Sequence, residues 1–146
     1  MSVTQTVRLS ELIQSLELKT IAPMEMSSRR LGDSPPQGSE IQLEWKQALA
    51  DGDPVATGPD ARVFRPKYDL TVKYGGSPFF QQTSVFIIAF RLKNNTLFDR
   101  LWTDESLRAV FVERQIRRTM WPIFRQHVLD GMSRLAMAPV TLPWIA

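Results

Sequence analysis

The chain has 146 residues, with 18 lysines and arginines against 15 acidic residues and a net charge of +3. Hydrophobic residues make up 43% and charged residues 23%, which excludes a wholly disordered chain or a collagen and indicates one globular domain over residues 1–146. The absence of cysteine excludes a disulfide framework, thiolate catalysis and a cysteine zinc site. Because there is one histidine, a multi-histidine metal cluster is excluded, and we expect neither metal nor cofactor.

The first eleven residues contain no apolar segment of the kind found in secretory signals. The longest strongly apolar run, Val85–Phe90, has six residues, whereas a spanning helix needs about 20. We therefore expect the protein to remain in the cytoplasm.

The N-terminal third predicts one strand and one long connection. Residues 4–14 are compatible with a short helix or with a frayed lead-in, which would cover residues 1–12. Leu16, Leu18 and Thr20 then alternate with charged residues at strand spacing, and Pro23 is expected to end this strand. Residues 24–39 are rich in glycine, proline and arginine and are interpreted as a crossover loop, longer than most connections.

The middle of the chain predicts three more strands. Residues 41–46 alternate between apolar and polar side chains, residues 50–60 form a loop, and residues 64–74 alternate again. Pro66 places that third strand at a sheet edge or in a bulge. The turn at residues 75–78 joins it to a fourth strand, residues 79–93, as a hairpin.

The fourth strand is apolar on both faces in its middle, with Phe86 and Ile88 on one side and Val85 and Ile87 on the other. A strand of this kind is normally covered on both sides. A sheet with one helix has little material for a second cover, so the pattern favours self-association.

The C-terminal third predicts one long helix. We interpret Asn94-Asn95 as a turn and Thr103 as an N-cap, after which apolar residues recur at helical spacing to Leu135. Pro122 should kink this helix, and prolines keep residues 136–146 as an extended tail. The predicted class is α+β: a four-stranded antiparallel sheet followed by one long kinked helix.

No catalytic motif accompanies this pattern. The sequence contains neither a phosphate-binding glycine loop nor a nucleophile elbow, and Asp51-Gly52-Asp53 lacks the other ligands of a calcium loop. We interpret His127, which lies beside apolar helical positions, as a partly buried helical residue with a polar partner rather than as a general base. The chain is expected not to be an enzyme.

Arginine is the abundant cation, with 13 of the 18 basic residues. Arg114, Arg118 and Arg125 fall on one side of the predicted helix. This arrangement suits phosphate contacts, so a nucleic-acid-binding α+β domain using the arginine-rich helix is the alternative function. The small net charge and the absence of nucleic-acid motifs make nucleic acid an unlikely partner.

Three stretches resemble the SecB family of bacterial protein-export chaperones. Residues 15–23 (SLELKTIAP) are similar to the first strand of the family and the start of its crossover loop. Residues 120–125 (MWPIFR) resemble the aromatic-proline step in its long helix, and residues 135–140 (LAMAPV) resemble the Leu-x-Leu-Ala-Pro-Val signature that follows.

The resemblance implies an ATP-independent holdase that binds non-native polypeptides and assembles as a homotetramer, a dimer of dimers with its helices between two sheets. It implies a client groove between the crossover loop and the sheet. The groove residues by resemblance are Met24, Met26, Leu31, Leu43, Trp45, Phe79, Phe80 and Trp144. The candidates for the oligomer interface are Leu16, Leu18, Arg117, Trp121 and Phe124.

The chain departs from the export-linked members of the family in its C-terminal part and its charge. Those members continue through a second helix and a tail that contacts the SecA motor, and they are acidic. Arg65, Lys67 and Lys73 stand where an acidic sheet face helps to dock SecA. Coupling to SecA is therefore left open, and a specialised client such as an antitoxin is an alternative to preproteins.

Overall fold

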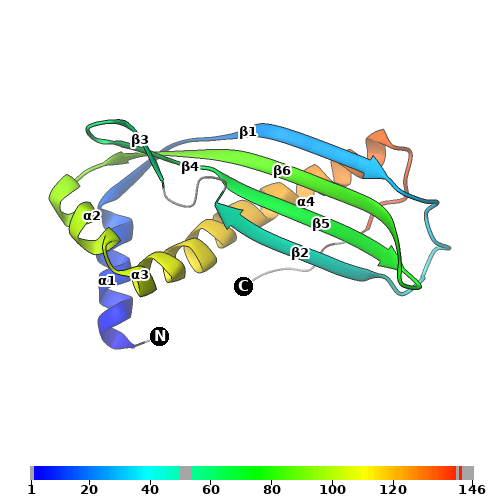
Figure 1. Ribbon diagram of the computed structural model, residues 1–146, viewed down its shortest axis with the longest axis horizontal. Coiled ribbons are helices and arrows are strands. Elements are labelled where there is room, and N and C mark those ends of the chain that lie inside the picture. Colours follow the sequence, from blue (N-terminus) through cyan, green and yellow to red (C-terminus); the bar gives the residue numbers. More distant parts are fainter. Residues whose placement is uncertain (1, 50–53, 141, 143–146) are drawn as a thin grey trace.

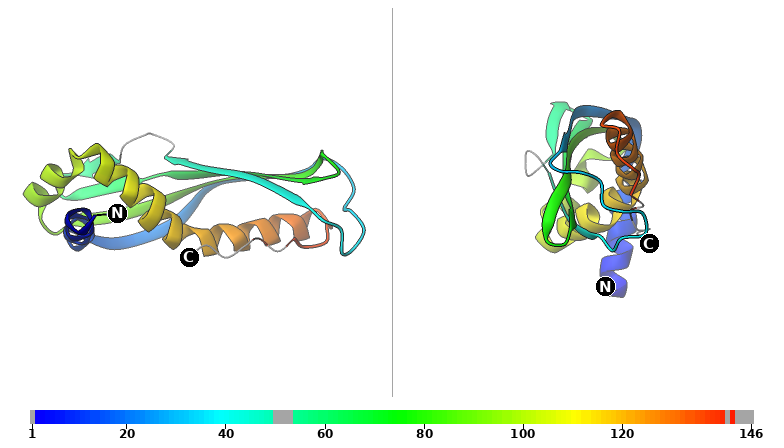
Figure 2. Two further views of the ribbon diagram at one scale, coloured as in Figure 1. Left: turned by 90° about the horizontal axis from the view of Figure 1, so that it is seen from below. Right: turned by 90° about the vertical axis from the view of Figure 1, so that its right-hand side faces the viewer.

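A computed structural model describes residues 2–49, 54–140 and 142. The described chain forms two layers, an antiparallel sheet and a long helical run that lies along one of its faces (Figures 1 and 2). Shorter helices gather at one end of the sheet (Figure 1). This confirms the α+β class and the long C-terminal helix.

The sheet has six strands rather than the expected four, in the order β2-β5-β6-β4-β3, with β1 paired to β6. The strands are β1 (Leu16–Arg30), β2 (Gln42–Leu49), β3 (Val55–Gly58), β4 (Ala61–Phe64), β5 (Pro66–Tyr74) and β6 (Ser77–Leu92). Two expectations were wrong here. The third strand divides at Arg65 because proline follows it, and part of the expected loop 50–60 forms the hairpin strand β3.

Strand β1 continues through Pro23 to Arg30, so the crossover loop expected at 24–39 is shorter and lies between β1 and β2. Among the described strands β1 pairs only with β6, which makes it an edge strand. Proline is tolerated on an edge because its missing N–H can face away from the ladder. The register shifts between Pro23 and Glu25, which places Met24 in the irregularity.

The helical part begins earlier than expected. Residues after Asn94 form helix α2 (Asn95–Trp102) and not a turn, because the Asn94 side chain accepts a hydrogen bond from the Leu97 N–H and caps the helix. Asp104, and not Thr103, caps the long helical run that follows. This run consists of α3 (Glu105–Val110), a π-helical segment (Phe111–Ile116) and α4 (Arg117–Arg134).

The long helical run changes direction along the sheet (Figure 2). Pro122 lies inside α4 and removes one backbone donor, and the π-helical segment widens the preceding turn. Both features are recognised causes of helix bending.

The core lies between the sheet and the long helix. Alternate residues of β5, including Tyr68, Leu70 and Val72, point towards the helix and are almost fully buried, while the residues between them are polar. Trp121 and Phe124 of α4 meet them from the other side. On the outer face of β6, Val85 is 7% exposed and Ile87 is half-buried, so one copy leaves only part of that face open.

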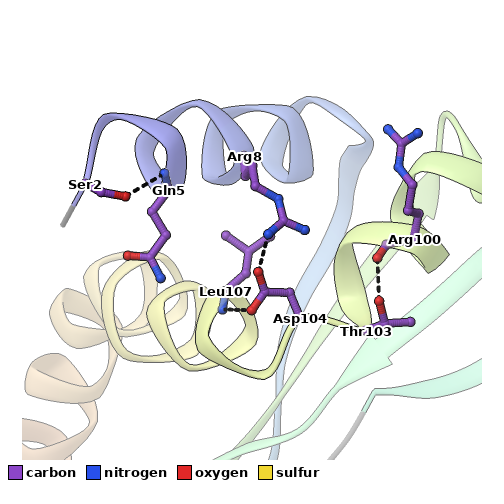
Figure 3. A network of polar contacts seen from close by, with 7 residues as sticks. All are labelled: Ser2, Gln5, Arg8, Arg100, Thr103, Asp104 and Leu107. Carbon is purple, nitrogen blue, oxygen red and sulfur yellow. Dashed lines mark hydrogen bonds and ion pairs between the residues drawn. The ribbon is translucent and has the colours of Figure 1, made fainter.

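The N-terminal lead-in is a helix, α1 (Val3–Gln14), which settles the alternative that the sequence left open. Ser2 caps it by accepting a hydrogen bond from the Gln5 N–H at 3.1 Å. Arg8 forms an ion pair with Asp104, which ties α1 to the start of α3 (Figure 3). Within the part of the chain that the structure describes, no helix has both the length and the apolar character needed to cross a membrane.

Candidate functional site

Four large apolar side chains stand exposed along β1 and just beyond its end. We call them the edge stripe: Leu18, Met24, Met26 and Leu31, which are 49%, 51%, 36% and 42% exposed. One edge of β1 pairs with β6. The other edge carries backbone N–H and C=O groups that do not pair with any other described strand. The edge stripe therefore combines apolar side chains with unpaired backbone, the two features that extended polypeptides recognise on a sheet edge.

A groove of about 170 Å³ opens where β1 begins, and we call it the proximal groove. Its lining is almost entirely apolar and comes from α1, β1, β6 and the helical run. The lining residues are Ile13, Leu16, Leu18, Ile88, Phe90, Phe111, Gln115, Ile116 and Thr119. Leu18 belongs to both the proximal groove and the edge stripe, so the two surfaces meet at this residue.

A larger hollow lies at the other end of the sheet, and we call it the distal hollow. Its volume is about 520 Å³, and its walls are the connection between β1 and β2, Phe79 of β6 and the tail segment Ala138–Val140. This is where the resemblance placed a client groove, between the crossover loop and the sheet. The tail forms one of its walls through Ala138–Val140, whereas the tail residue expected in the groove was Trp144.

The expected groove residues differ widely in their exposure. Met24, Met26 and Leu31 are exposed, whereas Phe80 is fully buried in the protomer core and presents no surface. Phe79 is 4% exposed but lines the distal hollow. Trp144 lies outside the described residues.

Leu43 and Trp45 are half-buried against the core on the helix side of β2. The Trp45 ring packs on Trp121 with centroids 4.5 Å apart, and the Arg117 guanidinium lies over it at 5.0 Å. Trp45 is therefore engaged within its own protomer by an aromatic and a cation–π contact.

Two of the interface candidates are enclosed within the protomer. Trp121 and Phe124 are 1% and 0% exposed, because the aromatic-proline step packs onto the chain's own sheet. Arg117 is held over Trp45, and Leu16 is 7% exposed. Of the interface candidates, Leu18 alone presents a large exposed surface, and its role between copies stays a prediction.

His127 has the burial expected of a helical histidine but not the polar partner. Its ring packs against Phe86 with centroids 4.8 Å apart, and its buried Nδ1 has no hydrogen-bond partner among the residues that the structure describes. Burial lowers the pKa of His127, and the charge of Arg134 adds to this while Asp130 opposes it. Among the described residues, no three histidine or acidic side chains gather as a metal site.

The arginines of the helix do not form one uniform surface. Arg114 and Arg118 are exposed, whereas Arg125 is half-buried and engaged. The sequence did not predict that Ile13 and Ile116 line the proximal groove. They come from α1 and the π-helical segment, and the local sequence does not show how these two elements pack together. The tail anchors Met137 and Leu142 were missed too, although their apolar spacing could have suggested them.

Comparisons with known proteins identify the fold. No family model and no curated protein matches the sequence. The structure is similar to that of the SecB-like chaperone of Mycobacterium tuberculosis in complex with a ChAD peptide from the HigA1 antitoxin, with a TM-score of 0.70, 15% identity and coverage of 98% of this chain and 100% of that one. A protein of unknown function from Streptococcus agalactiae has a TM-score of 0.41 and 10% identity over 88% of this chain and 97% of its own. The chain therefore has a SecB-like fold.

Proposed function

We propose that this protein is an ATP-independent holdase that binds unfolded polypeptides along the edge stripe. The observation that carries the proposal is the edge stripe of exposed apolar side chains along β1, whose outer backbone edge pairs with no other described strand. The likeness to a chaperone solved with a bound peptide supports it.

The chemistry of the edge stripe suits weak and unselective binding. An unfolded chain exposes apolar stretches, and removing them from water is favourable by about 25 cal/mol per Å². Met24 and Met26 have flexible side chains that adapt to different partners. The proximal groove extends the same apolar surface beyond Leu18.

Holding needs several such contacts on one particle. We propose a homotetramer, a dimer of dimers, in which sites on different copies bind one client and raise its net affinity through effective concentration. The edge of β1 and the half-open outer face of β6 are surfaces that a second copy would cover. The function is equilibrium binding and requires no catalytic step, metal or cofactor.

The clients we propose are non-native polypeptides in the cytoplasm. Two versions remain: preproteins handed to the SecA motor, and a specialised client such as an antitoxin. Stimulation of binding or release by SecA would favour the first, and co-purification with a small protein from a neighbouring gene would favour the second.

Light scattering of an aggregating client in nucleotide-free buffer tests the proposal. The wild-type protein should suppress aggregation, and a variant with Met24→Ser, Met26→Ser and Leu31→Ser should lose most of this effect. Trp45 is left unchanged because it packs on Trp121.

The matched control carries Val3→Ser and Val7→Ser on α1, which are 82% and 52% exposed but lie outside the edge stripe. This control should suppress aggregation like the wild type. The native mass of each variant must be measured as well, because β1 is also a candidate contact between copies. Equal suppression by the stripe variant and the control, at equal mass, would refute the site.

A further inference from the structure

Helix α4 ends in a turn that sends the chain back along the helix (Figure 2). The Met137 N–H donates to the Met132 carbonyl at 2.9 Å, and the Ala136 N–H donates to the Ser133 carbonyl at 3.1 Å. This pair of bonds is a Schellman motif, with Ala136 in the left-handed region at φ 54°. The tail direction is thus fixed by the helix end.

The tail that follows, residues 137–140 and 142 of the described chain, is held by the packing of its side chains. Met137 and Leu142 are 5% and 2% exposed and belong to the core, and Val140 packs partly against it. Ala138 and Pro139, between these anchors, are exposed. Within the described part of the chain, no backbone hydrogen bond holds residues 138–140.

We call the site that the described tail residues occupy the seat, and two hollows adjoin it. On one side of the tail lies the distal hollow, against the connection and Phe79. On the other side a second hollow of about 180 Å³ lies between the tail and α4, lined by Pro122, Arg125, Gln126, Leu129, Val140 and Leu142. The tail therefore separates two hollows.

We propose that the seat of residues 137–140 and 142 is a peptide-binding site for extended, uncharged apolar segments, which the chain's own tail occupies until a client displaces it. The inference deepens the proposed holdase function and rests on it. The tail shows which kind of segment the seat accepts. It contains Pro139 and is anchored by the apolar side chains of Met137, Val140 and Leu142.

Charge around the seat narrows the class of client segment. Arg125 lines the second hollow, between the tail and α4, and Arg134 lies exposed at the end of α4. The Arg30 guanidinium donates to the Leu135 carbonyl, 3.4 Å away, where the tail begins, but its charge is offset by an ion pair with Asp33 at 3.0 Å. Because Arg125 and Arg134 are cationic, segments with neutral or acidic flanks should bind in preference to lysine-rich ones.

Because the tail is part of the same chain, it competes with every client for the seat and lowers the apparent affinity of the client. The tail competes at the effective concentration of an intramolecular segment, and the apparent client affinity falls in proportion to the fraction of seats that it leaves open. A long unfolded chain that binds several sites at once overcomes this competition more easily than a short peptide does.

Thiol labelling can follow the tail directly, because the chain contains no cysteine. In the full-length variant Leu142→Cys, the thiol should react slowly in the protein alone. It should react at least several times faster when the protein is saturated with reduced, alkylated α-lactalbumin as a permanently unfolded client. Met120→Cys, at a core position with 0% exposure, should stay protected, and Arg118→Cys, at an exposed position, should react fast throughout.

A second variant tests occupancy without labelling. Leu142→Ser should loosen the tail and tighten client binding by about tenfold if the tail occupies nine-tenths of the seats. Unchanged or weaker client binding by this variant, or a Leu142→Cys thiol that stays protected at client saturation, would overturn the inference alone. If the wild-type protein binds no unfolded client, the proposed function fails.

Discussion

Gly131 of α4 lies directly against the Ser28 side chain of β1. A Cβ at position 131 would lie 3.1 Å from the Ser28 Cβ and 2.6 Å from Gln82 Oε1, and closer still to the Ser28 hydroxyl. That hydroxyl donates to Gln82 Oε1, and Gln82 Nε2 donates to Ser84 Oγ at 2.9 Å. The glycine therefore lets the helix approach a buried polar network on the sheet.

Gly131→Ala should destabilise the protein by about 1–3 kcal/mol, the usual cost of overpacking, although alanine is the better helix former. Urea unfolding measures the change. Ser133→Ala, at an exposed position two residues later, should change stability by no more than about 0.5 kcal/mol. A Gly131→Ala variant as stable as the wild type would contradict the close approach.

Ala136→Gly should stabilise the protein. Ala136 adopts φ 54°, where an L-residue costs about 1–2 kcal/mol and glycine costs little. Glycine also increases the entropy of the unfolded chain, so the net gain should be about 0.5–1 kcal/mol. Thermal or urea unfolding should show the gain, whereas Ala138→Gly, at an exposed residue without positive φ, should give none.

Asp104→Asn should make the protein less sensitive to acid. The hydrogen bond from the Leu107 N–H is the main cause of a pKa below the usual range for Asp104, and the charge of Arg8 adds to it while burial opposes it. A lowered carboxyl pKa contributes stability above the unfolded value of about 3.9, which is lost as the pH falls through the folded value. Asparagine keeps the N-cap acceptor but not the charge.

The stability difference between the wild type and Asp104→Asn should therefore be largest near neutral pH and disappear at the acidic end of the titration. Urea unfolding at a series of pH values measures it. Glu17, whose pKa is also lowered, mainly by its hydrogen bond with Arg91, is present in both proteins and does not contribute to the difference. A difference that does not depend on pH would show that the charge of the Asp104 carboxylate is not responsible.

Trp45 and Arg117 should be energetically coupled. The guanidinium lies 5.0 Å from the ring centroid of Trp45, and such contacts contribute about 0.5–2 kcal/mol depending on their exposure. A double-mutant cycle with Trp45→Leu and Arg117→Met measures the coupling. The same cycle with the exposed Arg118 in place of Arg117 should give a coupling close to zero.

Alternation and helical spacing predicted the antiparallel strands and the long helix because each of these elements has one buried face. The true end of β1 was not predicted, because Pro23 is compatible with a strand only at an edge, and edge position depends on the pairing with β6. Helix α2 was missed because Asn94 favours both turns and N-caps. The local sequence does not distinguish these two uses.

The candidate site was predicted only in part. Met24, Met26 and Leu31 were expected at a surface and are exposed, but Phe80, Trp121 and Phe124 are in the core. An aromatic side chain has the same sequence signal whether it fills a core or a binding surface. Which of the two it does depends on the path of α4 over the sheet.

Titration of a fluorescently labelled, permanently unfolded client in nucleotide-free buffer, with the folded form of the same client as the comparison, measures whether the protein is a holdase. A holdase should bind the unfolded form and should not bind the folded form. The Met24→Ser, Met26→Ser, Leu31→Ser variant should bind the unfolded form more weakly than the Val3→Ser, Val7→Ser control. Absence of binding to the unfolded form at protein concentrations up to ~100 μM would contradict the account.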